Sequence, residues 1–264
     1  MLSTSEREQF TEQGYVIVEA AVEPGLMTPL REAAARIADR TRRGDWPHFR
    51  AVGDGDVWGV QHLLHPDLGE PVFADYMASN PVLEVACDLL QGDLRLGLVN
   101  MLCNPAHRDF AIGWHRDMLP EELAPEEEVK RLAGYEGGVQ WNTALYDDSC
   151  LLIVPASHRR AATAEEREVQ FRRPMDSLTH QMVVNLKAGQ GVYYNSQLIH
   201  RGIYPSSQPR ATLHAALTRA DAMQFANHYT TVQWMEAPGF RESLPARLLP
   251  LYDRWREFGK ELGV

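Results

Sequence analysis

The sequence predicts a mainly β protein with flanking helices. Up to about residue 92, apolar side chains recur at helical spacing. From about residue 93 to 222, short β-rich runs alternate with turn residues, which is typical of an all-β sandwich or barrel. The chain has 264 residues, and 44% of them are hydrophobic, which is enough for one sizeable core. No change of composition marks a linker, so we expect a single domain over residues 1–264 that ends in a helical tail.

The first predicted elements are a short helix and a short strand. Residues 4–12, TSEREQFTE, predict a helix, because Thr4 or Ser5 can cap its N-terminus and acidic residues fall in its first turns. The run YVIVEAAV that follows Gly14 predicts a strand, since β-branched residues are enriched in strands.

Two longer helices are predicted next. In residues 24–44 apolar side chains recur at helical spacing, and Gly44 can end the helix. Residues 71–91 predict another helix, interrupted near Asn80–Pro81, because proline disfavours a helical conformation in the residue before it. The predicted buried face of the first of these two helices consists of Leu30, Ala34, Ile37 and Ala38.

The predicted strands of the second part are separated by turn residues. They lie at residues 94–104, 138–148, 150–158 and 210–220, with two more inside 180–202 that part at Gly189–Gly191. Between the first two of these strands, residues 118–138 are acidic and rich in proline and glycine. They predict a solvated surface segment with one short helix. A flexible lid over a site is the alternative.

Composition excludes several classes of partner. The formal net charge of -10 disfavours nucleic acid and polybasic membrane attachment, since both need a basic surface. No apolar run approaches the roughly 18 residues of a membrane span, and the N-terminal residues do not resemble a signal peptide. Three widely spaced cysteines without a CxxC pair fit neither a disulfide framework nor a zinc ribbon. We expect a cytoplasmic protein that acts on a small molecule.

The stretch GWHRDM, residues 113–118, carries the first part of a predicted metal site. His115 and Asp117 are two residues apart, so in extended chain their side chains face the same way while Arg116 faces the opposite way. Two ligands on one side are the start of a metal site, and a third ligand must come from elsewhere in the chain.

His200, in YYNSQLIHRG, is the predicted third ligand. It ends a predicted strand, and Arg210 follows ten residues later across the turn-rich segment GIYPSSQP. We therefore expect the chain to double back and to place Arg210 on a neighbouring strand close to His200. Two histidines and one carboxylate form the facial triad of non-haem Fe(II) oxygenases, which leaves metal positions open. A nearby arginine can bind a carboxylate with two hydrogen bonds.

At these residues the sequence resembles Fe(II)/2-oxoglutarate dioxygenases, and more closely the phytanoyl-CoA dioxygenase family. The shared pattern is HxD, a distal histidine and an arginine ten residues later. EREQFTEQGYVIVEAAV resembles the family's opening helix and strand, and GQGVYYNSQLIHRG its distal-histidine strand. CLLIVPASHR resembles its segment ending in Pro-Gly-Ser-His, with Ala156 in place of the glycine.

The resemblance implies the fold and the cofactors. The implied core is a double-stranded β-helix, a jelly roll related to the cupins, with helices packed on one side. The implied chemistry uses Fe(II), with 2-oxoglutarate chelating the metal, Arg210 binding its C5 carboxylate and O2 as a further substrate. The implied iron ligands are His115, Asp117 and His200.

The chain departs from the family at one position close to the distal histidine. The family often has serine or threonine two residues after that histidine, whereas this chain has Gly202, so one expected hydroxyl is missing. The candidates to replace this hydroxyl are Thr212, Tyr193 and Tyr194.

Other polar residues are candidates for cosubstrate or substrate contacts. In VQWNTALYDD, alternation places Gln140 and Asn142 on one face of a strand. Asn142 falls where the family has a pocket-facing residue, and a structural hydrogen bond is its alternative role. Asn100, on the first core strand, is a second candidate for the cosubstrate. His214 shares a strand face with Thr212, and a buried structural histidine is its alternative role.

The substrate is predicted only as a class. Trp58, Gln61 and His62, in VWGVQHLLHP, fall in a region that approaches the mouth of the site in the family, with surface packing as the alternative. No basic patch suits the phosphates of coenzyme A, so we expect a small or mid-sized metabolite, with hydroxylation of an unactivated C–H bond as the default outcome and desaturation or cyclisation as variants. The alternatives are a cupin-like metalloenzyme without 2-oxoglutarate and a non-catalytic jelly-roll binding protein.

Overall fold

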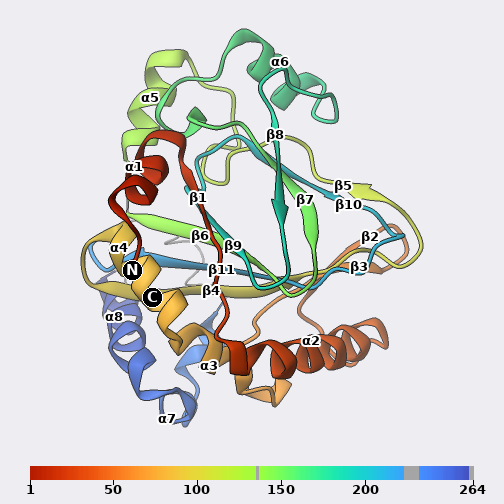
Figure 1. The fold of residues 1–264 in the computed structure, drawn as a ribbon, viewed down its shortest axis with the longest axis vertical. Coiled ribbons are helices and arrows are strands. Elements are labelled where there is room, and N and C mark those ends of the chain that lie inside the picture. Colours follow the sequence, from red (N-terminus) through yellow and green to blue (C-terminus); the bar gives the residue numbers. More distant parts are fainter. Residues whose placement is uncertain (135–136, 223–231, 262–264) are drawn as a thin grey trace.

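Two antiparallel sheets form the β part of the molecule (Figure 1). The structure, a computed structural model, describes residues 1–134, 137–222 and 232–261. In spatial order, the larger sheet contains β1 (Tyr15–Val18), β9 (Gly191–Tyr194), β6 (Gly138–Ala144), β11 (Thr212–Arg219), β4 (Leu94–Leu102), β3 (Asp56–Val60) and β2 (Phe49–Val52). The smaller sheet contains β5 (Phe110–Ala111), β10 (His200–Tyr204), β7 (Asp148–Ile153) and β8 (Met182–Leu186). The predicted class, mainly β with flanking helices and a jelly-roll core, is confirmed.

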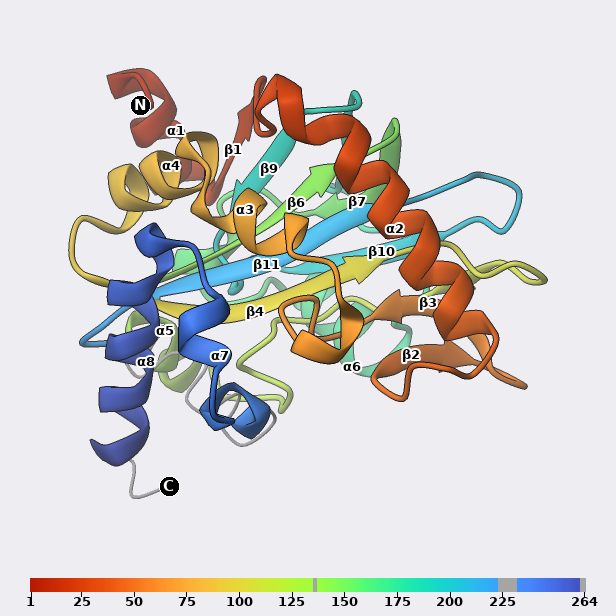
Figure 2. The same cartoon turned by 90° about the horizontal axis from the view of Figure 1, so that it is seen from below.

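Helices cover the outer face of the larger sheet. Figure 2 shows four of them across this face: α2 (Met27–Arg42), α3 (Val72–Ala78), α4 (Asn80–Leu90) and α8 (Leu249–Glu261). The remaining helices are α1 (Thr4–Gln13), α5 (Pro125–Ala133), α6 (Ala164–Arg172) and α7 (Phe240–Ser243). In the part of the chain that the structure describes, no helix combines the length and the apolar character needed to cross a bilayer.

The helix boundaries follow from local chemistry. The N-cap of α1 is Ser3, which forms a capping box with Glu6. The prediction of Thr4 or Ser5 as the N-cap is therefore wrong by at least one residue. Gly44 follows the end of α2 at a φ of 83°, a conformation that glycine adopts without strain. The predicted interruption of the next helix is confirmed at Ser79, and Pro81 lies in the first turn of α4.

Strand β6 separates the main core from the interior between the sheets. Trp141 and Thr143 point to the helix side, where the indole Nε1 donates to the Tyr76 hydroxyl at 2.8 Å and that hydroxyl lies 2.7 Å from Thr143 Oγ1. Gln140 and Asn142 point to the opposite side and line a pocket between the sheets. The predicted alternation is therefore confirmed. A smaller apolar cluster of Ala144, Leu151, Ile153, Val184, Leu186, Val192, Tyr194 and Leu198 joins the two sheets.

The chain path around the distal histidine differs from the prediction. His200 does not end a strand but begins β10, because β9 stops at Tyr194 and a turn follows in which Leu198 N donates to Asn195 O at 3.0 Å. Arg210 does not lie on a strand paired with β10. It lies two residues before β11, which belongs to the larger sheet, so residues 205–211 cross between the sheets.

Two other regions hold more structure than the sequence patterns indicated. Strands β2 and β3 extend the larger sheet beyond β4, although no strand was predicted around Trp58. Residues 118–134 contain α5, the expected short helix, but Glu128 and Leu132 of this helix are buried. The segment is therefore docked on the protein through specific side chains.

Replacing Tyr76 by phenylalanine tests the hydrogen bonds that join the helices to β6. Tyr76→Phe leaves the Trp141 indole N–H and the Thr143 hydroxyl without this buried partner. We expect the free energy of unfolding, measured by urea denaturation, to fall by about 1–3 kcal/mol. Tyr146→Phe is the matched control, because Tyr146 is 37% exposed, and should change stability by less than about 0.5 kcal/mol. Equal losses in both variants would contradict the assignment.

Candidate active site

Two of the predicted metal ligands are held together by their own backbones. His115 N donates to His200 O at 3.0 Å, and His200 N donates to His115 O at the same distance. The two residues therefore form an isolated antiparallel bridge, although His115 belongs to no strand. Asp117 N donates to Ser196 O at 3.3 Å and continues this pairing. The HxD segment is thus fixed against the residues that carry the distal histidine.

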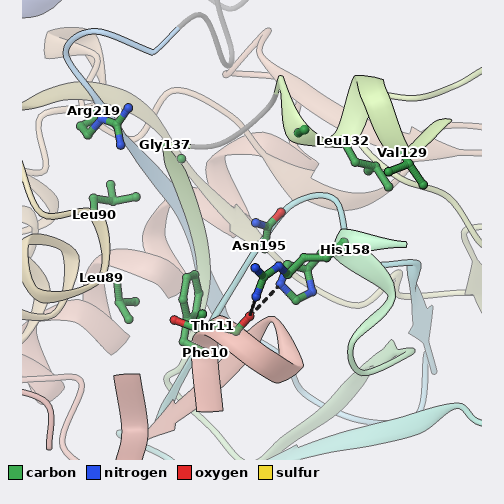
Figure 3. A pocket seen from close by; sticks show the side chains of 13 residues that line it. Phe10, Thr11, Leu89, Leu90, Val129, Leu132, Gly137, His158, Asn195 and Arg219 are labelled. Atoms are coloured by element: carbon green, nitrogen blue, oxygen red, sulfur yellow. Dashed lines mark hydrogen bonds between the residues drawn. The ribbon is translucent and has the colours of Figure 1, made fainter. Parts of the chain in front are cut away.

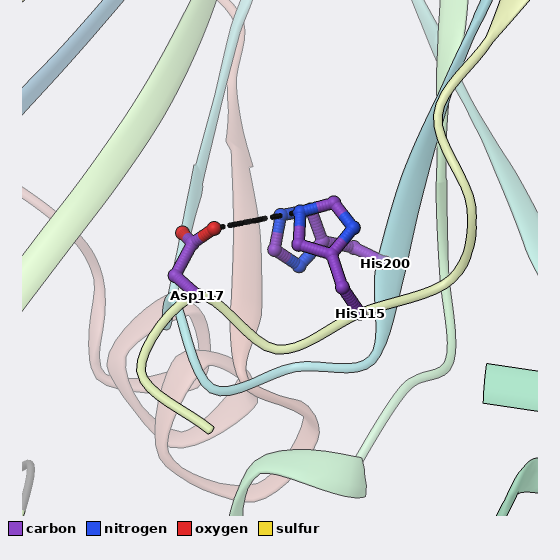
Figure 4. Close-up of side chains that lie close together, drawn as sticks. All are labelled: His115, Asp117 and His200. Atoms are coloured by element: carbon purple, nitrogen blue, oxygen red, sulfur yellow. Dashed lines mark ion pairs between the residues drawn. The ribbon is translucent and has the colours of Figure 1, made fainter. Parts of the chain in front are cut away.

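The imidazole rings are oriented by a repeated contact. Nδ1 of His115 lies 2.8 Å from Gly113 O, and Nδ1 of His200 lies 2.8 Å from Leu198 O. Because a carbonyl accepts, each Nδ1 carries the proton and each Nε2 has a free lone pair, as metal ligation requires. Both Nε2 atoms face Asp117 Oδ1, at 3.5 Å and 3.7 Å (Figure 4). The ligand atoms of these three residues all lie within 4.8 Å of one another.

The charge states also suit a cation. Burial alone would raise the pKa of Asp117, but the two histidines and the Gln140 amide hold it well below its ordinary value. Burial, followed by the charge on His115, lowers the pKa of His200 to about 4. At neutral pH the site therefore offers an ionised carboxylate and a neutral His200, the forms that bind metal. The Asp117 side chain remains 27% exposed, so the site is open to solvent on that side.

Strands β6 and β11 form the polar wall behind the ligands. The Gln140 amide donates to Asp117 Oδ2, which turns the other carboxylate oxygen toward the histidines. His214 Nδ1 lies 2.8 Å from Asn142 Oδ1, so His214 donates through Nδ1. Burial and the charge of Arg50 lower the pKa of His214 to about 3, which keeps this ring neutral. The wall therefore contains directed dipoles and no second carboxylate.

Arg210 reaches the same pocket from the segment that precedes β11. Its Nε donates to Asp148 Oδ2 at 2.9 Å in a pair whose side chains are 3% and 4% exposed. The Thr212 hydroxyl also donates to this carboxylate oxygen. Nη1 of Arg210 is buried and has no hydrogen-bond partner among the described residues. A buried donor without a partner is costly, so this nitrogen is available for an acceptor that enters the pocket.

Tyr204 explains why a glycine stands two residues after the distal histidine. A Cβ atom added at Gly202 would come within 2.6 Å of the Tyr204 hydroxyl oxygen. The same ring lies beside Arg210, with 4.9 Å between the guanidinium carbon and the ring centroid. The Tyr204 hydroxyl therefore lies where a side chain at position 202 would begin. None of the residues considered for the missing hydroxyl, Thr212, Tyr193 and Tyr194, lies there.

Arg116, between the two HxD ligands, faces away from the metal site, as alternation predicted. It donates to Ser157 O at 2.8 Å and to Arg160 O at 3.1 Å, and its Nη2 lies 3.3 Å from Glu128 Oε1. Glu128 also pairs with Arg167 at 2.8 Å. Burial lowers the pKa of Arg116 to about 10, so the side chain remains charged at neutral pH. The buried pair connects α5 to the metal-binding segment.

Most of the predicted site residues meet in one pocket. Among its lining residues are His115, Asp117, Gln140, Asn142, His200, Arg210 and His214. Thr212 lies behind Arg210 and contacts Asp148. Asn100 accepts from His62 N at 3.0 Å and is not among the lining residues. Trp58 packs on Tyr204 behind the pocket wall, while Gln61 and His62 lie outside the lining.

The sequence patterns missed several lining residues. Tyr204 alternates with His200 and Gly202 along β10, so strand periodicity could have identified it. Arg50 lies on a strand that was not predicted, and nothing in its sequence context distinguished it. The other missed lining residues are Leu102, Ile112, Cys150 and Leu151.

A larger cavity lies elsewhere in the molecule and lacks this chemistry. It has a volume of about 340 Å³, against about 70 Å³ for the pocket with the metal ligands. Its lining includes Phe10, Leu89, Leu132 and His158 (Figure 3). No carboxylate lines it, and His158 Nε2 contacts Thr11 O at 3.3 Å. The chemistry therefore places the active site in the smaller pocket.

The sequence profile of the phytanoyl-CoA dioxygenase (PhyH) family matches residues 10–212. The chain belongs to this family. It is an Fe(II)- and 2-oxoglutarate-dependent oxygenase, and the predicted Fe(II), 2-oxoglutarate and O2 agree with the donor set of the pocket. Neither alternative, the cupin-like metalloenzyme without 2-oxoglutarate or the non-catalytic binding protein, is supported by membership of the PhyH family.

Solved structures with the same fold are similar to this PhyH-family chain at low sequence identity. AviO1 from Streptomyces viridochromogenes Tue57 has a TM-score of 0.62 and 20% identity, over 83% of this chain and 95% of its own. The epimerase SnoN from nogalamycin biosynthesis has a TM-score of 0.60 and 20% identity, over 82% of each chain. EctD from S. alaskensis, with 2-oxoglutarate and 5-hydroxyectoine, has a TM-score of 0.64 and 16% identity, over 83% of this chain and 77% of its own. No curated protein matches the chain by sequence.

Glu128→Gln tests whether the buried charge pair fixes the metal-binding segment of this PhyH-family enzyme. The variant removes the carboxylate charge that faces Arg116 and Arg167. The positive charges of these two arginines are then no longer balanced by an acidic side chain of α5. We expect the free energy of unfolding to fall by about 3 kcal/mol in chemical denaturation. Glu127→Gln is the matched control, since its pair with Arg131 is exposed, and should cost less than about 1 kcal/mol. A stable Glu128→Gln protein would show that the pair does not hold α5.

Proposed function

We propose that His115, Asp117 and His200 bind Fe(II), and that Arg210 holds the C5 carboxylate of 2-oxoglutarate. The observation that carries the proposal is the convergence, in one pocket, of the three ligands with a buried arginine nitrogen that lacks a partner. A dicarboxylate that chelates the metal through one end has its other carboxylate free for this donor. Asp148 and Thr212 orient the guanidinium through Nε, which leaves its Nη1 edge for the cosubstrate.

Other residues have supporting roles in this proposal. The Tyr204 hydroxyl is the second donor to the C5 carboxylate, in place of the side chain absent at Gly202. Gln140 orients Asp117, and Asn142 with His214 forms the polar wall beside the chelating end. Asn100 holds the backbone of His62 and acts on the pocket only indirectly.

The proposed reaction is oxidation of an unactivated C–H bond of a small metabolite, with hydroxylation as the default outcome. Bound Fe(II), 2-oxoglutarate and O2 together supply the oxidising power. The chain's own residues fix the two ends of the cosubstrate and leave the Asp117 side of the metal open for the substrate. The similar structures include an epimerase and a carbocyclase from nogalamycin biosynthesis, which supports a role in specialised metabolism. A cytoplasmic location and the absence of nucleic acid or membrane partners are further predictions.

Anaerobic titration with Fe(II) and then 2-oxoglutarate tests the metal and cosubstrate assignment. We expect one Fe(II) per chain, followed by a visible charge-transfer band when 2-oxoglutarate chelates the metal. His200→Ala removes a ligand and should abolish both signals. His180→Ala is the matched control, because His180 is exposed and outside the pocket, and should leave both unchanged. Iron binding without the band would refute the cosubstrate assignment.

A pair of variants tests Arg210 without leaving a buried charge unpaired. Arg210→Met alone leaves the buried Asp148 carboxylate without its cation. The double variant Arg210→Met with Asp148→Asn removes both charges. We expect both proteins to bind Fe(II) and to lose about 10- to 100-fold in 2-oxoglutarate affinity, since hydrogen bonds to a charged group are lost. The charge-transfer band measures this affinity. Unchanged affinity in the double variant would show that another cation binds the cosubstrate.

A further inference from the structure

Arg50 is the second arginine of the active-site pocket and takes no part in the proposed binding of metal and cosubstrate. It lies on β2, the edge strand of the larger sheet, with Gly59 of β3 directly opposite. It lines the same pocket as the three metal ligands, yet its residue surface is exposed, whereas Arg210 is only 8% exposed. The two cations therefore occupy the solvent end and the deep end of one pocket.

No acidic side chain among the described residues pairs with the guanidinium of Arg50. Within the described residues it takes part in no ion pair and no hydrogen bond, and its contact is the ring of Trp58, with the ring centroid 5.4 Å from the guanidinium carbon. Two other arginines near the site have acidic partners, since Arg210 pairs with Asp148 and Arg116 with Glu128. An arginine that stacks on an aromatic ring keeps its N–H edge available for an oxyanion.

The charge of Arg50 acts on the interior of the pocket. After burial, it is the largest contribution that lowers the pKa of His214 on β11. It also favours ionisation of Tyr204 on β10, although burial outweighs this and raises the pKa of Tyr204. The charge of Arg50 therefore acts on lining residues of both sheets.

An apolar wall adjoins Arg50. Leu102, Ile112 and Tyr204 line the pocket, and Trp58 and Phe110 pack behind them in one cluster. The ring centroids of Trp58 and Phe110 lie 5.3 Å apart. A ligand between the metal and solvent thus contacts apolar side chains on one side and the Arg50 guanidinium at the mouth of the pocket.

We propose that Arg50 is the anion receptor for the substrate, which carries a carboxylate on an apolar body. The carboxylate binds the Arg50 guanidinium, the apolar body lies on Leu102, Ile112 and Tyr204, and this two-point contact selects the C–H bond that faces the metal. The proposal rests on the proposed function, because it places the cosubstrate carboxylate on Arg210.

The test uses the full chain loaded anaerobically with Fe(II) and saturating 2-oxoglutarate. The probes are octanoate and phenylacetate, with their primary amides as uncharged counterparts, and binding is measured by ligand-detected NMR. We expect the carboxylates to bind at least about tenfold more tightly than the amides. Arg50→Gln should remove this preference and leave amide binding unchanged, and Arg50→Lys should restore part of it. Arg42→Gln is the matched control, since Arg42 is exposed and lines a different groove.

Three results would overturn the proposal. Carboxylates that bind no better than their amides, or that do not bind to the loaded protein at all, would show that the mouth of the pocket does not select an anion. A carboxylate preference that survives in Arg50→Gln would assign it to another group. If the charge-transfer band of 2-oxoglutarate weakens in Arg50→Gln as much as in Arg210→Met, Arg50 is part of the cosubstrate site. Failure of the proposed function is distinguishable, because the unmodified protein would then show no band.

Discussion

The reciprocal backbone hydrogen bonds between His115 and His200 are the constraint on which the rest of the site depends. Without them, the HxD segment would be a loop beside β5, and its ligands would have no fixed distance from the distal histidine. The bridge uses only backbone atoms, so both imidazoles remain free to turn toward the metal. The Nδ1 contacts to Gly113 O and Leu198 O then fix each ring in the same manner. The backbone bridge and the Nδ1 contacts therefore together set the ligand geometry.

The two sheets contribute different parts of the site. The smaller sheet carries His200 and Tyr204 on β10, while the larger sheet carries Gln140, Asn142 and His214. Arg210 precedes β11 and reaches across to the Tyr204 ring. The pocket exists because these strands face each other, and the apolar cluster that joins the sheets keeps their separation. Helices on the outer face of the larger sheet contribute stability but no lining residue of this pocket.

Local patterns in the sequence predicted the β-rich class and the pair His115 and Asp117, while the resemblance to a known family implied the jelly roll and completed the ligand set with His200. Alternation in β6 separated Gln140 and Asn142 from Trp141, and the spacing of His115 and Asp117 indicated a shared direction. The sequence could not indicate which sheet β11 joins, since the turn-rich residues before Arg210 are compatible with a hairpin or a crossover. Arg50 was missed because its exposure and its lack of a partner are properties of the folded molecule. The burial of Glu128 was not predicted, because this residue lies in an acidic run that is typical of a solvated surface.

The replacement of a side chain at position 202 by the Tyr204 ring has a consequence for sequence variation. Serine at position 202 would force the Tyr204 ring to move, because the added Cβ would lie 2.6 Å from the phenol oxygen. Starting from this chain, Gly202→Ser alone creates a steric clash with Tyr204. Replacing Tyr204 alone removes the phenol hydroxyl before a serine or threonine hydroxyl is present at position 202. The two positions are expected to change together, and their mutational effects are non-additive. Phytanoyl-CoA dioxygenase relatives with a tyrosine at the position of Tyr204 should accordingly carry glycine at the position of Gly202.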